Sequence, residues 1–221
     1  MSWGAVGSLR FVTDRHPRGF RTGGATAVFV ALVLAVSACR SDDPYVPAGI
    51  MRTPAPDVSI VSLPDVTAGG ADFAFRAADG GIFVMYFGYT SCPDICPTTM
   101  ADLRSALREL GDDAERIEVG MATVDPLRDT DSVIAAYVHA FFPEGRAFRT
   151  EDDRALRAAA DAFGAAFEVT FNDEGLEEVI HTAFLYAVDD AGRLRLTWPF
   201  GIESEDMARD LRALLQEETN A

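Results

Sequence analysis

Two of the three cysteines in the 221-residue chain stand close together, and their spacing indicates a site for a metal ion or for thiol chemistry. Cys92 and Cys96 are separated by three residues, and Pro97 follows at the expected first turn of a helix. Backbone N–H groups and the helix dipole there favour the thiolate form of Cys96. Two thiolates can converge on one ion if the turn, which Pro93 restricts, is tight. The alternative is an inert disulfide of an exported protein, although closing so short a loop removes little unfolded-chain entropy.

His181 is a candidate third ligand from a distant part of the chain. It lies in an apolar stretch, where a lone histidine is more often a core residue than a ligand. Beside two thiolates, its imidazole completes a three-coordinate set that suits copper, since thiolates favour Cu(I) and the imidazole keeps Cu(II) acceptable. Zinc is a weaker fit, because it usually takes a fourth ligand or a catalytic water. We interpret His139, in a predicted helix beside Phe141 and Phe142, as a packing or surface residue.

The elements that must position these side chains follow an alternating order of strands and helices, which predicts an α/β sandwich. Apolar runs and helical spacing predict strands at 58–63, 82–89, 117–124, 166–170, 179–188 and 193–198, a small hairpin within 64–80, and helices at 97–110, 130–142, 151–164 and 203–216. Val133 is expected on the apolar side of the second helix. The cysteines leave the strand at 82–89 at its carboxyl end, where open α/β sheets collect their sites.

Three segments of this chain resemble the Sco/SenC family of copper-binding assembly proteins. They are FGYTSCPDICP at 87–97, VDPLRDT at 124–130 and HTAFLYAVD at 181–189, within a resemblance that covers roughly 56–218. The resemblance implies a thioredoxin-like fold of the peroxiredoxin-like variant, with a central mixed sheet flanked by helices. It also implies that Cys92, Cys96 and His181 bind copper as Cu(I) or Cu(II). The partner it implies is cytochrome c oxidase subunit II, whose copper-A site the family supplies or keeps reduced.

The second of these segments contains acidic residues whose roles are open. Asp125 is a candidate second-shell residue that could tune copper affinity or help to dock the target, or it simply ends a strand. We favour a helix cap for Asp129 or Thr130. Asp94, inside the cysteine loop, is expected to be solvated. Ile180 departs from the family pattern, which often has an acid immediately before the histidine; such an acid could hold the imidazole tautomer.

The amino terminus has the layout of a secretory signal, with arginines, the apolar run AVFVALVLAV at 27–36 and small residues before Cys39. The segment VSAC at 36–39 resembles the bacterial lipobox, which implies a lipoprotein signal peptide at 1–38 and a lipidated Cys39. The alternative is a plain secretory signal with an incidental cysteine. We therefore expect a flexible tether at 39–56, a domain at 57–221, and lipid anchoring at the outer face of the bacterial cytoplasmic membrane.

The chain is acidic, with a formal net charge of −16. Residues 1–38 hold four arginines and one aspartate, so a product that begins at Cys39 carries −19. Such a surface repels phosphate backbones, which argues against nucleic acid as a partner, and it suits cations or a partner with a basic patch. The chain contains no lysine, which excludes Schiff-base and lysine-base mechanisms.

These residues leave three candidate functions. A copper metallochaperone, which is not an enzyme in the strict sense, uses all three candidate ligands. A membrane-anchored thiol-disulfide oxidoreductase is the alternative, with Cys92 attacking and Cys96 resolving. Dedicated oxidoreductases of this fold carry Cys-x-x-Cys, whereas this chain has one residue more and a histidine that thiol exchange does not require. A peroxidase is weakest, because Thr90 stands two residues before Cys92 and not three.

Overall fold

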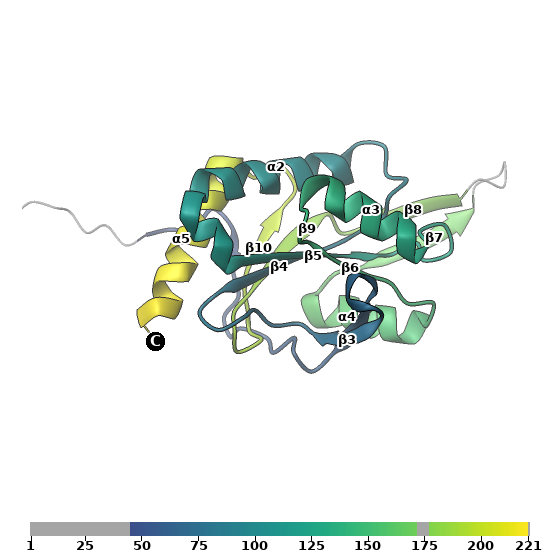
Figure 1. Ribbon diagram of the computed structural model, residues 1–221, viewed down its shortest axis with the longest axis horizontal. Coiled ribbons are helices and arrows are strands. Elements are labelled where there is room, and N and C mark those ends of the chain that lie inside the picture. Colours follow the sequence, from purple (N-terminus) through teal and green to yellow (C-terminus); the bar gives the residue numbers. More distant parts are fainter. Residues whose placement is uncertain (1–44, 172–176, 221) are drawn as a thin grey trace, which may run out of the picture. The chain divides into compact units, whose positions relative to one another are not determined.

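The computed structural model describes residues 45–171 and 177–220. The predicted signal peptide, Cys39 and residues 40–44 of the predicted tether lie outside these residues. The described part of the chain folds around a mixed sheet (Figure 1). In spatial order its eight strands are β1 (Ile50–Met51), β10 (Leu194–Pro199), β9 (Phe184–Val188), β4 (Ile82–Gly88), β5 (Ile117–Thr123), β6 (Arg146–Phe148), β2 (Ser62–Asp65) and β3 (Ala71–Ala74).

Strand β4 lies at the centre of the sheet and is buried along its whole length. It pairs in parallel with β5 and antiparallel with β9. Because side chains alternate along a strand, Ile82, Val84 and Tyr86 enter one apolar cluster while the intervening phenylalanines and Met85 enter the other. A continuous apolar run of this kind is the pattern of a strand covered on both faces.

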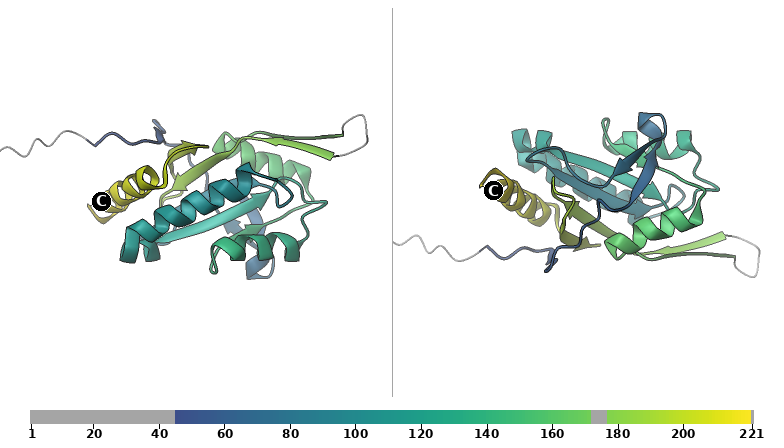
Figure 2. Two further views of the ribbon diagram at one scale, coloured as in Figure 1. Left: turned by 90° about the horizontal axis from the view of Figure 1, so that it is seen from above. Right: turned by 90° about the horizontal axis from the view of Figure 1, so that it is seen from below.

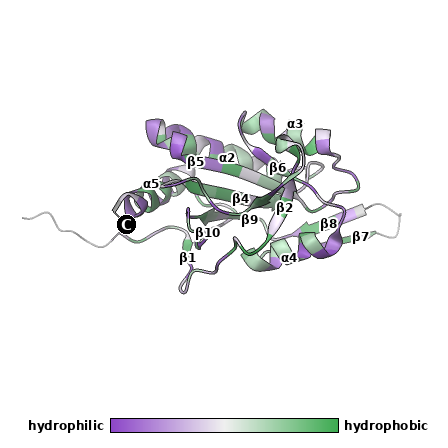
Figure 3. Cartoon of the chain, turned by 60° about the horizontal axis from the view of Figure 1, so that its bottom comes forward, coloured by the Kyte–Doolittle hydropathy of each residue, from purple (hydrophilic) through white to green (hydrophobic). Residues whose placement is uncertain are grey.

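Helices cover both faces of the sheet (Figures 1 and 2). One face carries α2 (Ile95–Leu110), α3 (Asp131–Phe141) and α5 (Ser204–Asn220), and the other carries α4 (Asp153–Phe163). Apolar residues concentrate on β4 and β9, while the helices carry hydrophilic stretches (Figure 3). Gly164 closes α4 in the left-handed conformation with φ 71°, as the predicted helix end requires. The placement of Val133 on the apolar side of α3 was wrong, because that side chain is exposed.

The apolar run at 179–188 forms two strands and not the single strand that the sequence predicts. Strand β8 (Glu177–His181) pairs with β7 (Phe167–Phe171) in a separate two-stranded ribbon, while β9 belongs to the central sheet. Figure 2 shows this ribbon extending beyond the central sheet. The chain changes sheets at Thr182 and Ala183, immediately after His181.

Two other strand predictions need adjustment. The expected strand at 58–63 begins only at Ser62. It pairs with β3, so the hairpin predicted within 64–80 begins two residues earlier than expected. The short strand β6 carries no periodic signal and was missed, although it extends the parallel part of the sheet beside β5.

The folded part of the chain begins earlier than the boundary expected at residue 57. Strand β1 pairs with β10, and the backbone N–H groups of Ala48 and Gly49 donate to the carboxylate of Asp210 at 3.1 and 2.9 Å. The indole N–H of Trp198 donates to the same carboxylate at 2.7 Å. Asp210 is buried, so these donors supply the hydrogen bonds that a buried carboxylate requires. Among the described residues, no helix has the length and apolarity needed to cross a membrane.

Candidate metal centre

The two cysteines lie on the connection between β4 and α2, at the carboxyl end of β4. Cys96 is in the first turn of α2 and is buried, whereas Cys92 is half-buried in the preceding loop. The backbone N–H of Cys96 donates to Sγ of Cys92 at 3.3 Å. Both cysteines are free thiols. The connection is therefore tight enough to bring both sulfurs to one side of the loop.

His181 reaches the cysteines because β9 runs antiparallel to β4. The start of β9 therefore lies beside the end of β4, and His181 precedes that start by three residues. Its Nε2 lies 3.4 Å from Sγ of Cys96. The two sulfurs and one imidazole nitrogen all lie within 4.8 Å of one another. This separation is well below the roughly 10 Å that would have excluded a shared ion.

Backbone and aromatic contacts orient the imidazole. Nδ1 of His181 lies 3.3 Å from the carbonyl oxygen of Thr182, a contact that favours the tautomer with the proton on Nδ1 and leaves the Nε2 lone pair facing Cys96. Tyr86 and Tyr89 approach the ring edge-on, with ring centroids 6.0 and 5.7 Å away. The carbonyl of Thr182 thus holds the imidazole tautomer, the role considered for an acid immediately before the histidine. Ile180, which occupies that position, is 64% exposed.

The two thiols differ in their pKa values. The sequence predicts a thiolate at Cys96, but the thiol that ionises more readily is Cys92. Burial raises the pKa of Cys96 to about 12, despite its place at the start of α2. Burial also opposes ionisation of Cys92, but hydrogen bonds from the backbone N–H groups of Cys96 and Asp94 and from the side chains of Cys96 and Tyr89 together hold its pKa below the ordinary thiol value. The helix N-terminus therefore favours the thiolate of the cysteine outside it.

This difference predicts selective alkylation. We expect iodoacetamide to modify Cys92 of the reduced protein at neutral pH at least about tenfold faster than Cys96, because the thiolate is the nucleophile. The rate at Cys92 should level off at a pH below the ordinary thiol pKa, while Cys96 should still be gaining reactivity at the highest pH tested. Peptide mapping by mass spectrometry separates the two, and equal rates would contradict the proposed asymmetry.

Burial also lowers the pKa of His181, so the imidazole stays neutral at physiological pH and keeps a lone pair for a metal ion. The donor set is two sulfurs and one nitrogen, which fits a soft ion such as Cu(I). The structure thus brings together all three of the predicted ligands, and the described residues contain no other cluster of metal-binding side chains of this kind. His139, by contrast, is exposed on α3 and contacts the carbonyl of Gly145.

A model of the SCO1/SenC family matches residues 66–216, which is well over half of the chain. The chain belongs to the SCO1/SenC family. A Stutzerimonas stutzeri protein named for copper binding is 31% identical over 124 residues, which are 56% of this chain and 60% of that protein. An SCO2-like protein of Rickettsia prowazekii is 32% identical over 116 residues, 52% of this chain and 56% of that protein. The chain thus spans less than two thirds of the length of these two relatives.

Solved Sco structures share the fold. ScoI of Bradyrhizobium japonicum with copper bound is 26% identical, with a TM-score of 0.59 over 70% of this chain and 96% of that one. Apo Sco1 of Thermus thermophilus is 28% identical, with a TM-score of 0.66 over 78% of this chain and 99% of that one. These matches, with the mixed sheet and its flanking helices, confirm the thioredoxin-like fold of this SCO1/SenC protein.

Of the two candidate caps, Asp129 was wrong, because Asp129 of this SCO1/SenC chain does not cap a helix and the N-cap position falls on Thr130. The N-cap of α3 is Thr130, which makes no side-chain capping bond. Asp129 is fully buried and accepts hydrogen bonds from the backbone N–H and hydroxyl of Thr90 and from the hydroxyl of Thr123. It therefore ties the end of β5 to the loop that carries Cys92. The sequence signal for this role is absent, because Thr90 and Asp129 are far apart in the chain.

Asp125 contacts the metal centre only through intermediates. It is buried and forms an ion pair with Arg128, whose guanidinium lies over the ring of Tyr89 at 5.9 Å. Tyr89 in turn contacts His181. The prediction of a second-shell role stays a prediction, and its route is this chain of contacts. Asp94 is exposed, as expected.

Proposed function

We propose that this SCO1/SenC protein is a copper metallochaperone that binds Cu(I) or Cu(II) through Cys92, Cys96 and His181. The observation that carries the proposal is the convergence of two sulfurs and a neutral imidazole nitrogen within 4.8 Å. Thiolates hold Cu(I), and the imidazole makes the site tolerant of Cu(II). The copper-bound state of the Bradyrhizobium japonicum relative supports the choice of metal.

Copper is the cargo in this function, and its transfer proceeds by ligand exchange. Binding releases the proton of Cys96, whose pKa of about 12 keeps it a thiol in the free protein. Cys92 is the more exposed sulfur, so a thiolate of the acceptor replaces it first. Replacement of Cys96 follows, and His181 leaves last. The proton that Cys96 recovers after transfer favours release, because it removes a buried negative charge.

We infer from the family that the acceptor is subunit II of cytochrome c oxidase at its copper-A site, and that a lipid on Cys39 holds the protein at the outer face of the cytoplasmic membrane. A lipid anchor would confine the protein to the surface of that membrane. Radiolabelled fatty acid incorporation that is lost in Cys39→Ser would support the anchor, and unchanged incorporation would remove it.

Thiol-disulfide exchange is a second candidate, which the asymmetry of the two thiols favours. Cys92 is accessible with a lowered pKa, as an attacking thiolate needs, and Cys96 is buried behind it as a resolving thiol. In that reaction Cys92 attacks a target disulfide to form a mixed disulfide, and Cys96 then displaces the reduced target and loses its proton. His181 has no part in these steps, so its replacement separates the two functions.

We expect the reduced protein to bind about one Cu(I), and we expect His181→Ala to weaken retention of Cu(II) most. The loss should exceed the ~10–100-fold that changes around a metal ligand typically cause, because the only nitrogen ligand is removed. Competition titration with a Cu(II) chelator measures the affinity. His139→Ala is the matched control, since His139 is exposed and is not part of the cluster that His181 forms with the two cysteines. Unchanged Cu(II) affinity in His181→Ala would remove His181 from the site.

A further inference from the structure

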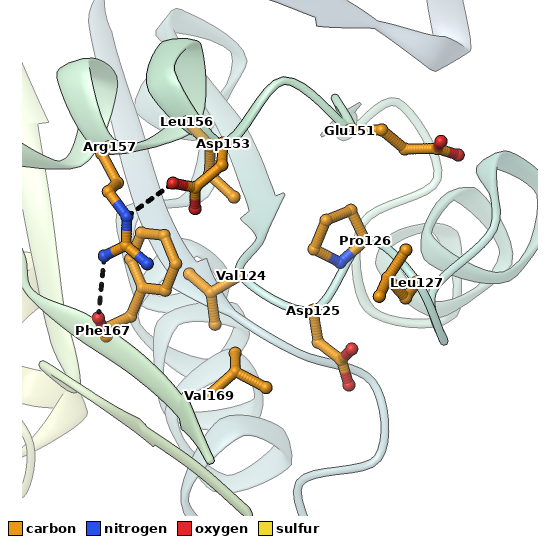
Figure 4. A pocket seen from close by; sticks show the side chains of 10 residues that line it. All are labelled: Val124, Asp125, Pro126, Leu127, Glu151, Asp153, Leu156, Arg157, Phe167 and Val169. Carbon is orange, nitrogen blue, oxygen red and sulfur yellow. Dashed lines mark hydrogen bonds and ion pairs between the residues drawn. The ribbon is translucent and has the colours of Figure 1, made fainter. Parts of the chain in front are cut away.

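A pocket of about 230 Å³ opens between the end of β5, the start of α4 and strand β7. Figure 4 shows its lining. The apolar part of the lining consists of Val124, Leu156, Phe167, Val169, Pro126 and Leu127. Its volume is below the ~300–1,000 Å³ of sites that hold small molecules. The pocket is therefore suited to one inserted side chain rather than to a cofactor.

None of the three candidate ligands lines the pocket, but two sets of contacts link its lining to the metal centre. Phe167 is the cross-strand partner of His181 in the ribbon of β7 and β8, and Val169 follows on the same face of β7. Asp125, also in the lining, binds Arg128, whose guanidinium lies over the ring of Tyr89 beside the imidazole. A side chain seated in this pocket would contact Phe167, the cross-strand partner of His181. It would also contact Asp125, the ion-pair partner of Arg128.

The mouth of the pocket exposes apolar surface. Leu127 is 79% exposed at its edge, and Phe171, which continues the pocket face of β7, is 70% exposed. Phe171 is not part of the lining, so Leu127 is the exposed apolar side chain at the edge of this largely apolar pocket. Exposed apolar surface that forms a patch is typical of interaction sites. Carboxylates outnumber arginines in the lining, with Asp125, Glu151 and Asp153 against Arg157. Glu151 and Asp153 already form ion pairs with Arg149 and Arg157 of the same chain. The affinity for a partner protein would therefore come from apolar contact, while charge would mainly affect the rate of association.

We propose that this pocket receives an apolar side chain of the copper acceptor protein during transfer. The inference rests on the proposed function. An acceptor thiolate must approach Cys92, the exposed ligand, and a protein that does so covers the adjoining edge of the sheet. An anchor beside the site fixes the acceptor in the orientation that ligand exchange needs, because correct positioning converts a bimolecular exchange into an intramolecular one.

Two variants test the pocket in different ways. Leu127→Asp places a charge at the exposed mouth, and Val169→Phe fills the pocket while it remains apolar. The matched control is Ile60→Asp, an equally exposed apolar residue in the segment beside the β9–β10 turn, at the opposite end of the sheet from the cysteines. The probe is the soluble copper domain of cytochrome c oxidase subunit II. Its affinity for each Cu(I)-loaded protein is measured by titration calorimetry, and copper transfer is followed separately to that domain and to bathocuproine disulfonate.

We expect both pocket variants to weaken acceptor binding at least about tenfold, with Ile60→Asp unchanged and with release to the chelator equal in all proteins. Acceptor binding equal to wild type in both pocket variants, or absent from the wild type, would overturn the proposal. So would self-association of the wild type that Leu127→Asp abolishes, which would assign the pocket to a second copy. If the wild type binds the acceptor through the pocket but transfers no copper to it, the result would refute the chaperone function and leave the docking site standing.

Discussion

Replacement of either Cys92 or Cys96 by serine should abolish tight binding of copper in both oxidation states. Each substitution removes one of two sulfurs that lie within 4.8 Å of the imidazole nitrogen and leaves a hydroxyl that is a poor ligand for a soft ion. Competition with bathocuproine disulfonate for Cu(I), and with a nitrogen chelator for Cu(II), measures the loss. We expect at least about a thousandfold, which corresponds to ~4 kcal/mol.

The two serine variants also distinguish the two functions. Cys92→Ser removes the exposed nucleophile and should abolish reduction of a target disulfide at the first step. Cys96→Ser should instead trap the mixed disulfide, because the attacking thiol remains while the resolving thiol is gone. Thermal unfolding close to that of wild type shows that each variant is folded. A folded variant that still held copper as tightly as wild type would refute the two-thiolate site.

The sequence was sufficient to nominate the three ligands because their chemistry is local to each residue type. Two cysteines next to a helix start and one histidine on an apolar strand could be named without knowing the fold. Their ionisation could not be predicted in the same way. The position of Cys96 in the first turn of α2 suggested a thiolate, but burial raises its pKa to about 12, and the backbone N–H stabilises Cys92 instead.

Strands with a continuous apolar run could be predicted from the sequence. Strand boundaries that depend on pairing with distant segments could not. Strand β4 follows from its composition, since a run buried on both faces contains only apolar residues and glycine. The division of 179–188 into β8 and β9 has no such signal, because neither glycine nor proline interrupts the run. Pairing of β8 with β7 moves it out of the central sheet, and this pairing places His181 at the junction.

The asymmetry of the cysteine pair connects the structure with both candidate functions. A low pKa and exposure at Cys92 suit an entry point for an acceptor thiolate and for a target disulfide alike. Only copper binding also uses His181, whose ring is oriented by Thr182, Tyr86 and Tyr89. Orienting contacts of this kind are typical of metal ligands, which is why we rank metal transfer above thiol exchange.

Asp129→Asn should destabilise the protein strongly although Asp129 contacts no ligand. The carboxylate is fully buried and accepts hydrogen bonds from the backbone N–H and hydroxyl of Thr90 and from the hydroxyl of Thr123. An amide is neutral and has one acceptor oxygen in place of two, so a hydroxyl that faces its NH2 group must turn and accept. Because hydrogen bonds to charged groups are worth ~1.5–3 kcal/mol each, we expect the free energy of unfolding to fall by about 2–4 kcal/mol. Urea unfolding measures this change.

Asp131→Asn is the matched control two residues away. Asp131 is 66% exposed and pairs with Arg149, so its loss should cost at most ~1 kcal/mol. The Asp129 variant should also bind Cu(I) more weakly than the control, because Thr90 lies two residues before Cys92 and its backbone N–H is held by Asp129 at 2.9 Å. Equal stability of the two variants would show that the buried carboxylate is replaceable. If the Asp129 variant is less stable but binds Cu(I) as tightly as the control, then Asp129 stabilises the fold without determining the geometry of the metal centre.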